Sequence, residues 1–238
     1  MLSCSKDEFE QTYGTKLISI AYKEDYNSGI EEYSYSSNDE LIMIEDFRSL
    51  GRRYEVEYDN GLVKEFFTYR IDNNKLIFRD SILYNADRSI HAIYNFSINS
   101  GEDLPLTWIY EFEYDNESKV TRKSTYFVNI GEYTSIEKYY WKENNIERVM
   151  YCDKDEVLYY EYFYEYDNKK NYQKNLSTDL SDPINWSDNN VTSMDWNDYV
   201  GNLDIICRPC IAEYVYNLDN YPVSIKYNWG REMILSYE

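Results

Sequence analysis

The stretch Tyr54-Glu55-Val56-Glu57-Tyr58-Asp59-Asn60-Gly61 contains a strand pattern followed by a turn pattern. Alternate residues of a strand point to opposite faces of a sheet, so the two tyrosines and Val56 share one face and the two glutamates share the other. Asp-Asn-Gly tolerates positive φ and is a strong signal for a tight hairpin turn. The stretch therefore predicts a strand with one aromatic face and one acidic face, which ends in a hairpin.

The same unit recurs along the chain. Clear copies lie at 110–116 and 164–168, a late variant lies at 214–220, and weaker copies lie at 35–39, 71–74, 84–87 and 141–145. If the residue before each turn is taken as the anchor, positions 35, 58, 84, 114, 141 and 166 are 23 to 30 residues apart. Self-similarity at a regular period indicates an array of one supersecondary unit. We predict an all-β fold that is an antiparallel meander of repeated hairpins.

The length of 238 residues suits a single all-β domain, which we place at 13–238. The chain has no long apolar stretch with a helical period, so no helix is expected to cover the aromatic face. A sheet of many strands then has to curl on itself to bury that face. The expected shape is a strongly curved, partly open sheet, half-barrel or barrel-like, with one irregular capping segment.

The repeat lapses at residues 172–210, where Asp, Asn, Ser and single tryptophans dominate. Such a segment either caps an open end of the sheet or carries function. We favour a cap that includes a short helix, with Trp186 and Trp196 packed inward against the aromatic face. The alternative is a sugar-stacking platform built from the two tryptophans, with Asp182, Asp188 and Asp195 binding sugar hydroxyls.

The N-terminus contains Leu2-Ser3-Cys4, which has the form of the end of a bacterial lipobox, with Cys4 as the lipidated residue. The basic and apolar regions of a signal peptide do not precede it, so we interpret residues 1–12 as a lipobox remnant and an acidic tether. No stretch approaches the ~20 apolar residues of a spanning helix. We therefore expect attachment to the outer membrane, on the cell surface, through an N-terminal lipid.

The chain resembles the uncharacterised Bacteroidetes lipoproteins built from YD-type repeats, which also occur in larger RHS proteins. Besides the Tyr-x-Tyr-Asp turns, the similar features are Tyr-Asp-Asn-Lys-Lys-Asn at 166–171, Asp-Asn-Asn-Val-Thr at 188–192, and the closing segments at 213–216 and 221–225. Tyr172 stands where relatives commonly have proline. The resemblance covers the chain from about residue 13 and implies an all-β surface lipoprotein; it implies no catalytic or ligand residues.

The composition and the motifs argue against several functions. The 44 acidic and 24 basic residues give a net charge of −20, which disfavours nucleic acid as a partner. The eight glycines are too far apart for a phosphate-binding loop or a nucleophile elbow, and one histidine excludes His-Glu-x-x-His. Cys207-Arg208-Pro209-Cys210 runs directly into a predicted strand, so a local disulfide or two packed thiols is favoured over a redox or zinc site. We predict no cofactor and no metal site.

Three functions remain. The first is a non-enzymatic surface module that binds or assembles with a ligand, for which a glycan or a surface protein is the candidate. The second is a carrier that holds a lipid or another apolar ligand on the aromatic face. The third is an extracellular glycoside hydrolase with a carboxylate pair near Trp186 and Trp196, because 44 acidic residues provide many possible pairs.

Overall fold

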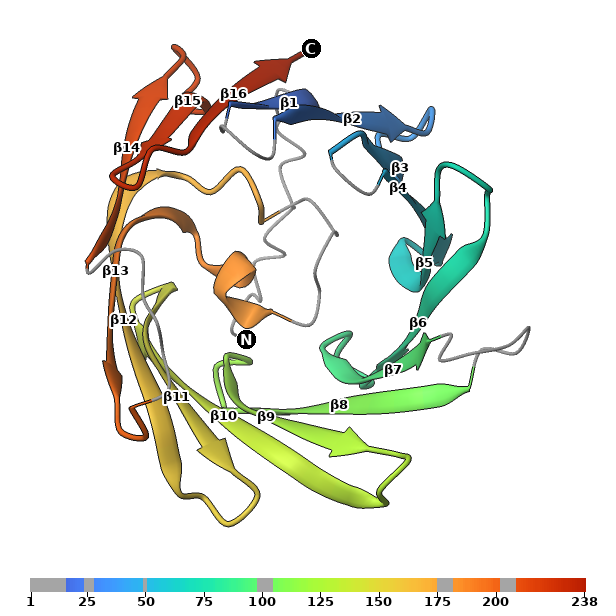
Figure 1. The fold of residues 1–238 in the computed structure, drawn as a ribbon, viewed down its shortest axis with the longest axis vertical. Helices are drawn as coiled ribbons and strands as arrows, with labels where there is room; N and C mark the ends of the chain where they lie inside the picture. Colours follow the sequence, from blue (N-terminus) through green and yellow to red (C-terminus); the bar gives the residue numbers. More distant parts are fainter. Residues whose placement is uncertain (1–15, 24–27, 49–50, 98–104, 175–181, 202–208) are drawn as a thin grey trace, which may run out of the picture.

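In the computed structural model the chain forms a closed antiparallel β-barrel (Figure 1). The structure describes residues 16–23, 28–48, 51–97, 105–174, 182–201 and 209–238. Each strand pairs with its neighbours in sequence, and the last strand pairs with the first. The elements are β1 (Leu17–Lys23), β2 (Gly29–Tyr35), β3 (Leu41–Asp46), β4 (Arg52–Asp59), β5 (Leu62–Arg70), β6 (Leu76–Tyr84), β7 (Ile90–Ser97), β8 (Leu106–Tyr114), β9 (Val120–Phe127), β10 (Glu132–Lys142), β11 (Asn145–Asp153), β12 (Leu158–Lys170), the 3-10 helix η1 (Pro183–Trp186), β13 (Asn189–Asp198), β14 (Cys210–Tyr216), β15 (Pro222–Tyr227) and β16 (Glu232–Tyr237).

The prediction of an all-β meander of hairpins is confirmed, whereas the prediction that the sheet stays partly open is wrong. Strands β1 and β16 pair along their length, and the backbone N–H of Glu238 donates to the carbonyl of Lys16 at 2.9 Å. An open sheet leaves the N–H and C=O groups of its two edge strands unpaired. The meander is long and curved enough for its edges to meet, and closure satisfies these groups.

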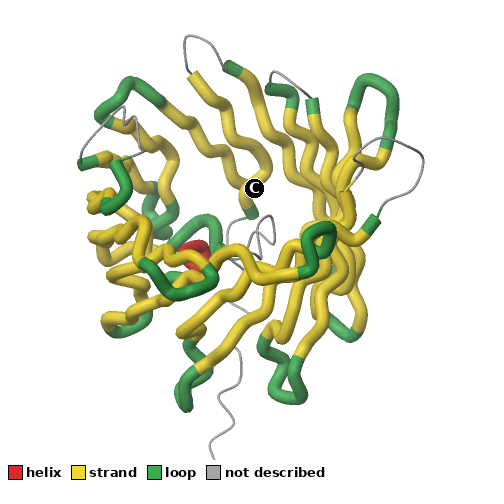
Figure 2. Tube along the Cα trace, turned by 60° about the horizontal axis from the view of Figure 1, so that its bottom comes forward, coloured by secondary structure: helices red, strands yellow, loops and turns green. Residues whose placement is uncertain are grey.

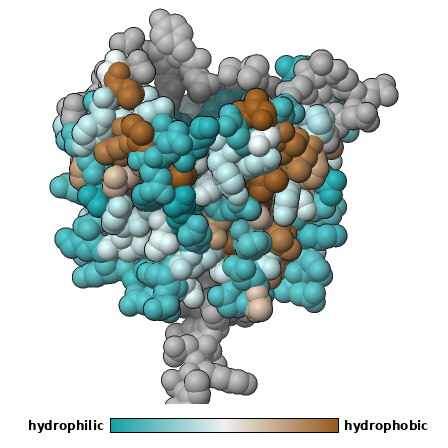
Figure 3. Space-filling model, turned by 90° about the horizontal axis from the view of Figure 1, so that it is seen from below, coloured by the Kyte–Doolittle hydropathy of each residue, from teal (hydrophilic) through white to brown (hydrophobic). Residues whose placement is uncertain are grey.

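The aromatic face of the repeat lines the inside of the barrel. Figure 1 places η1 inside the ring, and the rings of Phe112 and Trp186 lie 5.8 Å apart. Because Phe112 alternates with Glu111 and Glu113, these glutamates point outward. Figure 3 accordingly shows a largely hydrophilic outer face, with apolar residues gathered in its upper half.

Each even-numbered strand is tied to the strand before it by an aromatic side chain. A tyrosine hydroxyl, or in β10 the indole N–H of Trp141, donates to a backbone carbonyl within the first three residues of the preceding strand, at 2.7–2.9 Å. We call these contacts the rim hydrogen bonds. Their donors are Tyr35, Tyr58, Tyr84, Tyr114, Trp141, Tyr166, Tyr214 and Tyr237. The recurring tyrosine therefore satisfies a backbone acceptor in addition to filling the interior.

A β-bulge lies opposite most of these donors, on the next strand. The strand register shifts directly before Tyr35, Tyr58, Tyr84, Tyr114, Trp141 and Tyr166. The extra residue lies on the following odd-numbered strand: Lys64 of β5, for example, stands between the partners of Glu57 and Tyr58. The repeat thus encodes an inward aromatic donor, a tight turn and then a bulge on the next strand.

Removal of one rim hydrogen bond is expected to cost about 1 kcal/mol. Tyr84→Phe deletes the hydroxyl that donates to the carbonyl of Val63 at 2.8 Å and keeps the ring. Urea unfolding should show this loss, whereas the same change at Tyr94, which lies on the outer face of β7, should cost less than about 0.5 kcal/mol. Equal losses in the two variants would contradict the role assigned to the rim hydrogen bonds.

The turns that follow the even-numbered strands are short, except between β12 and β13. The short turns contain residues with positive φ, namely Asp39, Asn60, Arg88, Ser118, Glu143 and Asn220. After β12 the chain instead enters the barrel, and η1 lies within the ring of strands (Figure 2). The segment predicted as irregular, 172–210, is not irregular throughout, because β13 (Asn189–Asp198) pairs with β12 and β14. Because most residues of β13 are polar, the alternation that places Met194 and Trp196 inward was not recognised in the sequence.

Candidate functional site

The two tryptophans named from the sequence lie inside the barrel and contact different partners. Trp186, at the end of η1, packs against the core cluster that contains Phe112 and Tyr139. Trp196, on β13, is 3% exposed, and its ring lies 6.4 Å from that of Tyr162. These positions match a cap whose tryptophans pack inward, and they do not place the two rings on one exposed platform.

The three aspartates named from the sequence lie in three different environments. Asp182 caps η1, and its carboxylate accepts the backbone N–H of Ile184 at 3.2 Å. Asp188 accepts from Asn144 Nδ2 at 2.8 Å and forms an ion pair with Lys174. Asp195 precedes the inward Trp196 on β13 and therefore points outward. The structure does not bring the three carboxylates around one cavity.

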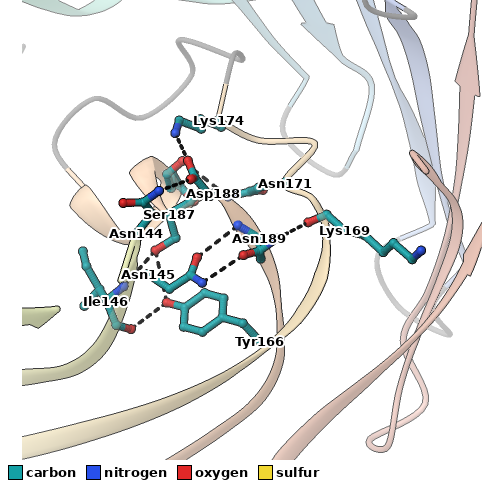
Figure 4. Close-up of polar contacts among 11 residues, drawn as sticks. Asn144, Asn145, Ile146, Tyr166, Lys169, Asn171, Lys174, Ser187, Asp188 and Asn189 are labelled. Atoms are coloured by element: carbon teal, nitrogen blue, oxygen red, sulfur yellow. Dashed lines mark hydrogen bonds and ion pairs between the residues drawn. The ribbon is translucent and has the colours of Figure 1, made fainter. Parts of the chain in front are cut away.

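A polar network anchors the segment that enters the barrel (Figure 4). Asn145 and Asn189 exchange hydrogen bonds of 2.9 and 3.1 Å, and Ser187 Oγ accepts the backbone N–H of Ile146 at 3.1 Å. Ser187 is fully buried, and Asn171 Nδ2 donates to its carbonyl at 3.0 Å. Buried polar groups that are satisfied in this way hold a segment in one conformation. Asn171, Ser187 and Asn189 are therefore held in fixed positions.

This anchoring positions Tyr172 against strands from both ends of the chain. The backbone N–H of Tyr172 donates to Oδ1 of Asn190 at 3.3 Å, and Asn190 is 2% exposed. The Tyr172 ring packs against the core cluster that contains Ile20, Ile44 and Met233. Burial raises the pKa of the Tyr172 hydroxyl well above its usual value. Two cavities border Tyr172.

The larger cavity, of about 260 Å³, is the candidate site, and we call it the lumenal chamber. Five of its lining side chains are tyrosines, and three are other polar groups. The complete lining is Ile20, Tyr22, Glu31, Tyr33, Ile44, Tyr54, Tyr172, Gln173, Tyr227, Arg231 and Met233. The smaller cavity, of about 150 Å³, also borders Tyr172 and reaches Asn185, Met194 and Trp229.

Charged groups at the lumenal chamber are held in fixed positions. Arg48 forms ion pairs with Glu31 and with Asp46, the latter at 2.8 Å. Burial by itself would raise the pKa of Asp46, but hydrogen bonds from Arg48 hold it below its usual value. The Tyr33 hydroxyl donates to the Glu31 carboxylate at 2.7 Å. The chamber therefore presents an oriented carboxylate among aromatic rings.

The sequence did not single out the lumenal chamber, because its lining comes from β1 to β4, from β15 and β16, and from the segment after β12. No two of Tyr22, Glu31, Tyr172 and Arg231 belong to one local motif. Tyr172 was noted only as a departure from the proline of similar proteins. Its position at the point where the repeat lapses was the one available signal.

The cysteine predictions are only partly described by the structure. Cys4 and Cys207 lie outside the described residues. Cys210 is disulfide-bonded, and Cys152 is a free, buried thiol whose pKa is raised by burial. Among the described residues, no group of three or more His, Cys, Asp or Glu side chains is placed to hold a metal ion. In the same part of the chain, no helix has the length and apolar character needed to cross a membrane.

A solved structure with a similar fold comes from Bacteroides. A porin-like protein from Bacteroides uniformis superimposes with a TM-score of 0.60 and 12% identity, over 94% of this chain and 97% of the other. A porin-like protein from Bacteroides vulgatus gives a TM-score of 0.45 and 11% identity, over 94% and 99% of the two chains. No protein-family model and no curated protein matches the chain. At 12% identity the likeness concerns the fold alone.

Proposed function

We propose that the protein is a non-enzymatic binding module of the bacterial surface, and that it takes a saccharide unit in the lumenal chamber. The observation that carries the proposal is the chamber itself, in which five tyrosines surround Glu31, Gln173 and Arg231 in about 260 Å³. Pockets of small ligands combine apolar walls with a few fixed polar groups. The tyrosine rings would cover the faces of a sugar ring, and the polar groups would bond its hydroxyls.

Two features of the chamber favour a sugar over an acyl chain. Tyrosine hydroxyls and charged groups line the chamber, and burial of an acyl chain against them would leave these polar groups without compensation. The volumes of about 260 and 150 Å³ lie below the 300–1,000 Å³ that is usual for larger apolar ligands. The lipid-carrier function is therefore the second candidate.

We further propose that the barrel stays in water and that its membrane contact is the lipid on Cys4. Exposed charges lie on the outer face of many strands, among them Glu32, Glu57, Glu113, Glu165 and Lys226. A barrel embedded in lipid presents an apolar band on that face instead. The fold shared with a porin-like protein from Bacteroides accords with an outer-membrane location.

Lipidation of Cys4 can be tested by fusing the chain to a lipoprotein signal peptide and labelling the cells with palmitate. The proposal expects label on the wild-type chain and loss of label in Cys4→Ser. Equal labelling of the two chains would remove Cys4 as the anchor.

Ligand binding can be tested by titrating mono- and disaccharides while saturation-transfer NMR is recorded. Gln173→Ala removes one polar group from an exposed position in the chamber lining, so binding should weaken about fivefold to tenfold without loss of fold. Tyr172→Ala should weaken binding at least about tenfold by removing a ring.

Tyr133→Ala is the matched control, because Tyr133 is 42% exposed at the start of β10, away from the chamber lining. Its affinity should equal that of the wild-type protein. Loss of binding in Tyr133→Ala but not in Gln173→Ala would place the site elsewhere. Absence of binding across a broad glycan array would overturn the saccharide proposal.

A further inference from the structure

The lumenal chamber gathers positive charge in a chain of net charge −20. Among the described residues, three arginines, Arg48, Arg52 and Arg231, and two carboxylates, Glu31 and Asp46, lie in it or beside it. Arg231 lines the chamber, and Arg48 forms ion pairs with both carboxylates. Arg52 pairs across the strands with Asp46 and hydrogen-bonds Tyr54. The local excess among the described side chains is therefore cationic, against the sign of the whole molecule.

The tyrosine walls do not form a cage for a ligand cation. The guanidinium carbon of Arg48 lies 4.1 Å from the ring centroid of Tyr22, and that of Arg231 lies 5.0 Å from the same ring. Arg231 also lies 6.0 Å from the ring centroid of Tyr227. A quaternary ammonium group needs these aromatic faces for itself and would meet two positive charges.

We infer that the chamber selects a saccharide unit bearing a carboxylate, that is, a uronic acid residue. This inference rests on the proposed saccharide function. A planar guanidinium fork matches a planar carboxylate, and Arg231 supplies that fork in the chamber lining. Other tyrosine rings of the lining then flank the sugar, while Glu31 and Gln173 accept or donate at its hydroxyls.

The experiment compares sugars that differ only at C6: glucose with glucuronate, and galactose with galacturonate, titrated at low salt with the full chain. The uronate should bind at least about tenfold more tightly than its neutral partner, because a charge-assisted hydrogen bond replaces a neutral one. The preference should shrink as salt is added, because screening weakens the contact. Glucose 6-sulfate is a third ligand. It should bind less tightly than glucuronate, because its sulfate is not planar and matches the planar guanidinium of Arg231 less well than a carboxylate does.

Arg231→Gln should abolish the preference for the uronate over its neutral partner, and Arg52→Gln should reduce it. Arg148→Gln, which removes an arginine on the outer face of β11 that pairs with Glu161 at 3.3 Å, should change neither affinity. Circular dichroism of each variant establishes that the barrel is intact.

The outcomes separate this inference from the function on which it rests. Equal or tighter binding of the neutral sugars overturns the selection of a carboxylate and leaves the saccharide function standing. A preference that survives both Arg231→Gln and Arg52→Gln also overturns the inference. Failure of every sugar to bind overturns the saccharide function and this inference together.

Discussion

Above pH 10 the barrel is expected to unfold in one cooperative step, before pH 12. Burial is the main cause that raises the pKa of Tyr35 and that of Tyr84 to about 12, and the neighbouring Tyr58 is a smaller cause in the same direction. Burial also raises the pKa of Tyr139 and of Tyr172 well above its usual value. Each of these hydroxyls holds its proton more tightly in the folded state than in the unfolded state, where its pKa is about 10.

The sign follows from proton linkage. Below pH 10 each of these tyrosines contributes its full stabilisation, and the contribution falls by about 1.4 kcal/mol per pH unit as pH rises toward the folded pKa. Four such groups together remove about 5 to 6 kcal/mol per pH unit, which is comparable to the whole stability of a typical domain. Acidification through the same range should restore the fold.

Phenolate absorbance at 295 nm and far-ultraviolet circular dichroism, recorded on the same samples, measure this transition. Most of the absorbance change should coincide with the loss of β signal. Tyr84→Phe should lower the dependence of unfolding free energy on pH by about 1.4 kcal/mol per pH unit, because one titrating group is gone. Smooth ionisation of all tyrosines near pH 10 with unchanged β signal would contradict the expectation.

The substitution Lys123→Met is expected to destabilise the barrel by about 3 to 4 kcal/mol. Lys123 Nζ lies 2.7 Å from Glu137 Oε1 inside the barrel, and the two side chains are only 10% and 9% exposed. The Tyr139 hydroxyl donates to the other carboxylate oxygen of Glu137 at 2.6 Å. Removal of the lysine leaves a buried carboxylate without its cation, which is a large penalty in a medium of low polarity.

Urea unfolding of the single and double variants measures the effect. Lys123→Met combined with Glu137→Met should be less destabilised than Lys123→Met alone, because the uncompensated charge is gone. The control is Lys154→Met: Lys154 lies 3.0 Å from Glu132, but these side chains are 49% and 50% exposed, so the loss should stay below about 0.5 kcal/mol. If Lys123→Met lowers the free energy of unfolding no more than the control does, the buried ion pair contributes little to stability.

Most local features of the fold could be predicted from the sequence, and most of the features that were missed depend on long-range contacts. Tyr54, Val56 and Tyr58 revealed an aromatic face because alternation needs only neighbouring residues. The same alternation at Met194 and Trp196 was overlooked among Asn, Asp and Ser, so β13 was predicted as irregular. Tyr237 was not recognised as a member of the repeat, because no turn follows it, yet it donates a rim hydrogen bond.

The candidate site was predicted at the segment where the repeat stops, and the lumenal chamber does border that segment through Tyr172 and Gln173. The particular residues named, Trp186, Trp196 and the three aspartates, are not among its lining. A lapse in a repeat indicates that the chain leaves the sheet. It does not reveal which strands the departing segment will face.

The sequence by itself determined the hairpin unit, the aromatic and acidic faces, and the tight turns, because strand periodicity and turn chemistry act over a few residues. Tertiary structure decided that β16 meets β1, that the segment after β12 enters the lumen, and that Tyr22, Glu31, Tyr172 and Arg231 surround one cavity. These outcomes depend on strand number, register and closure of the whole ring, which no local pattern contains.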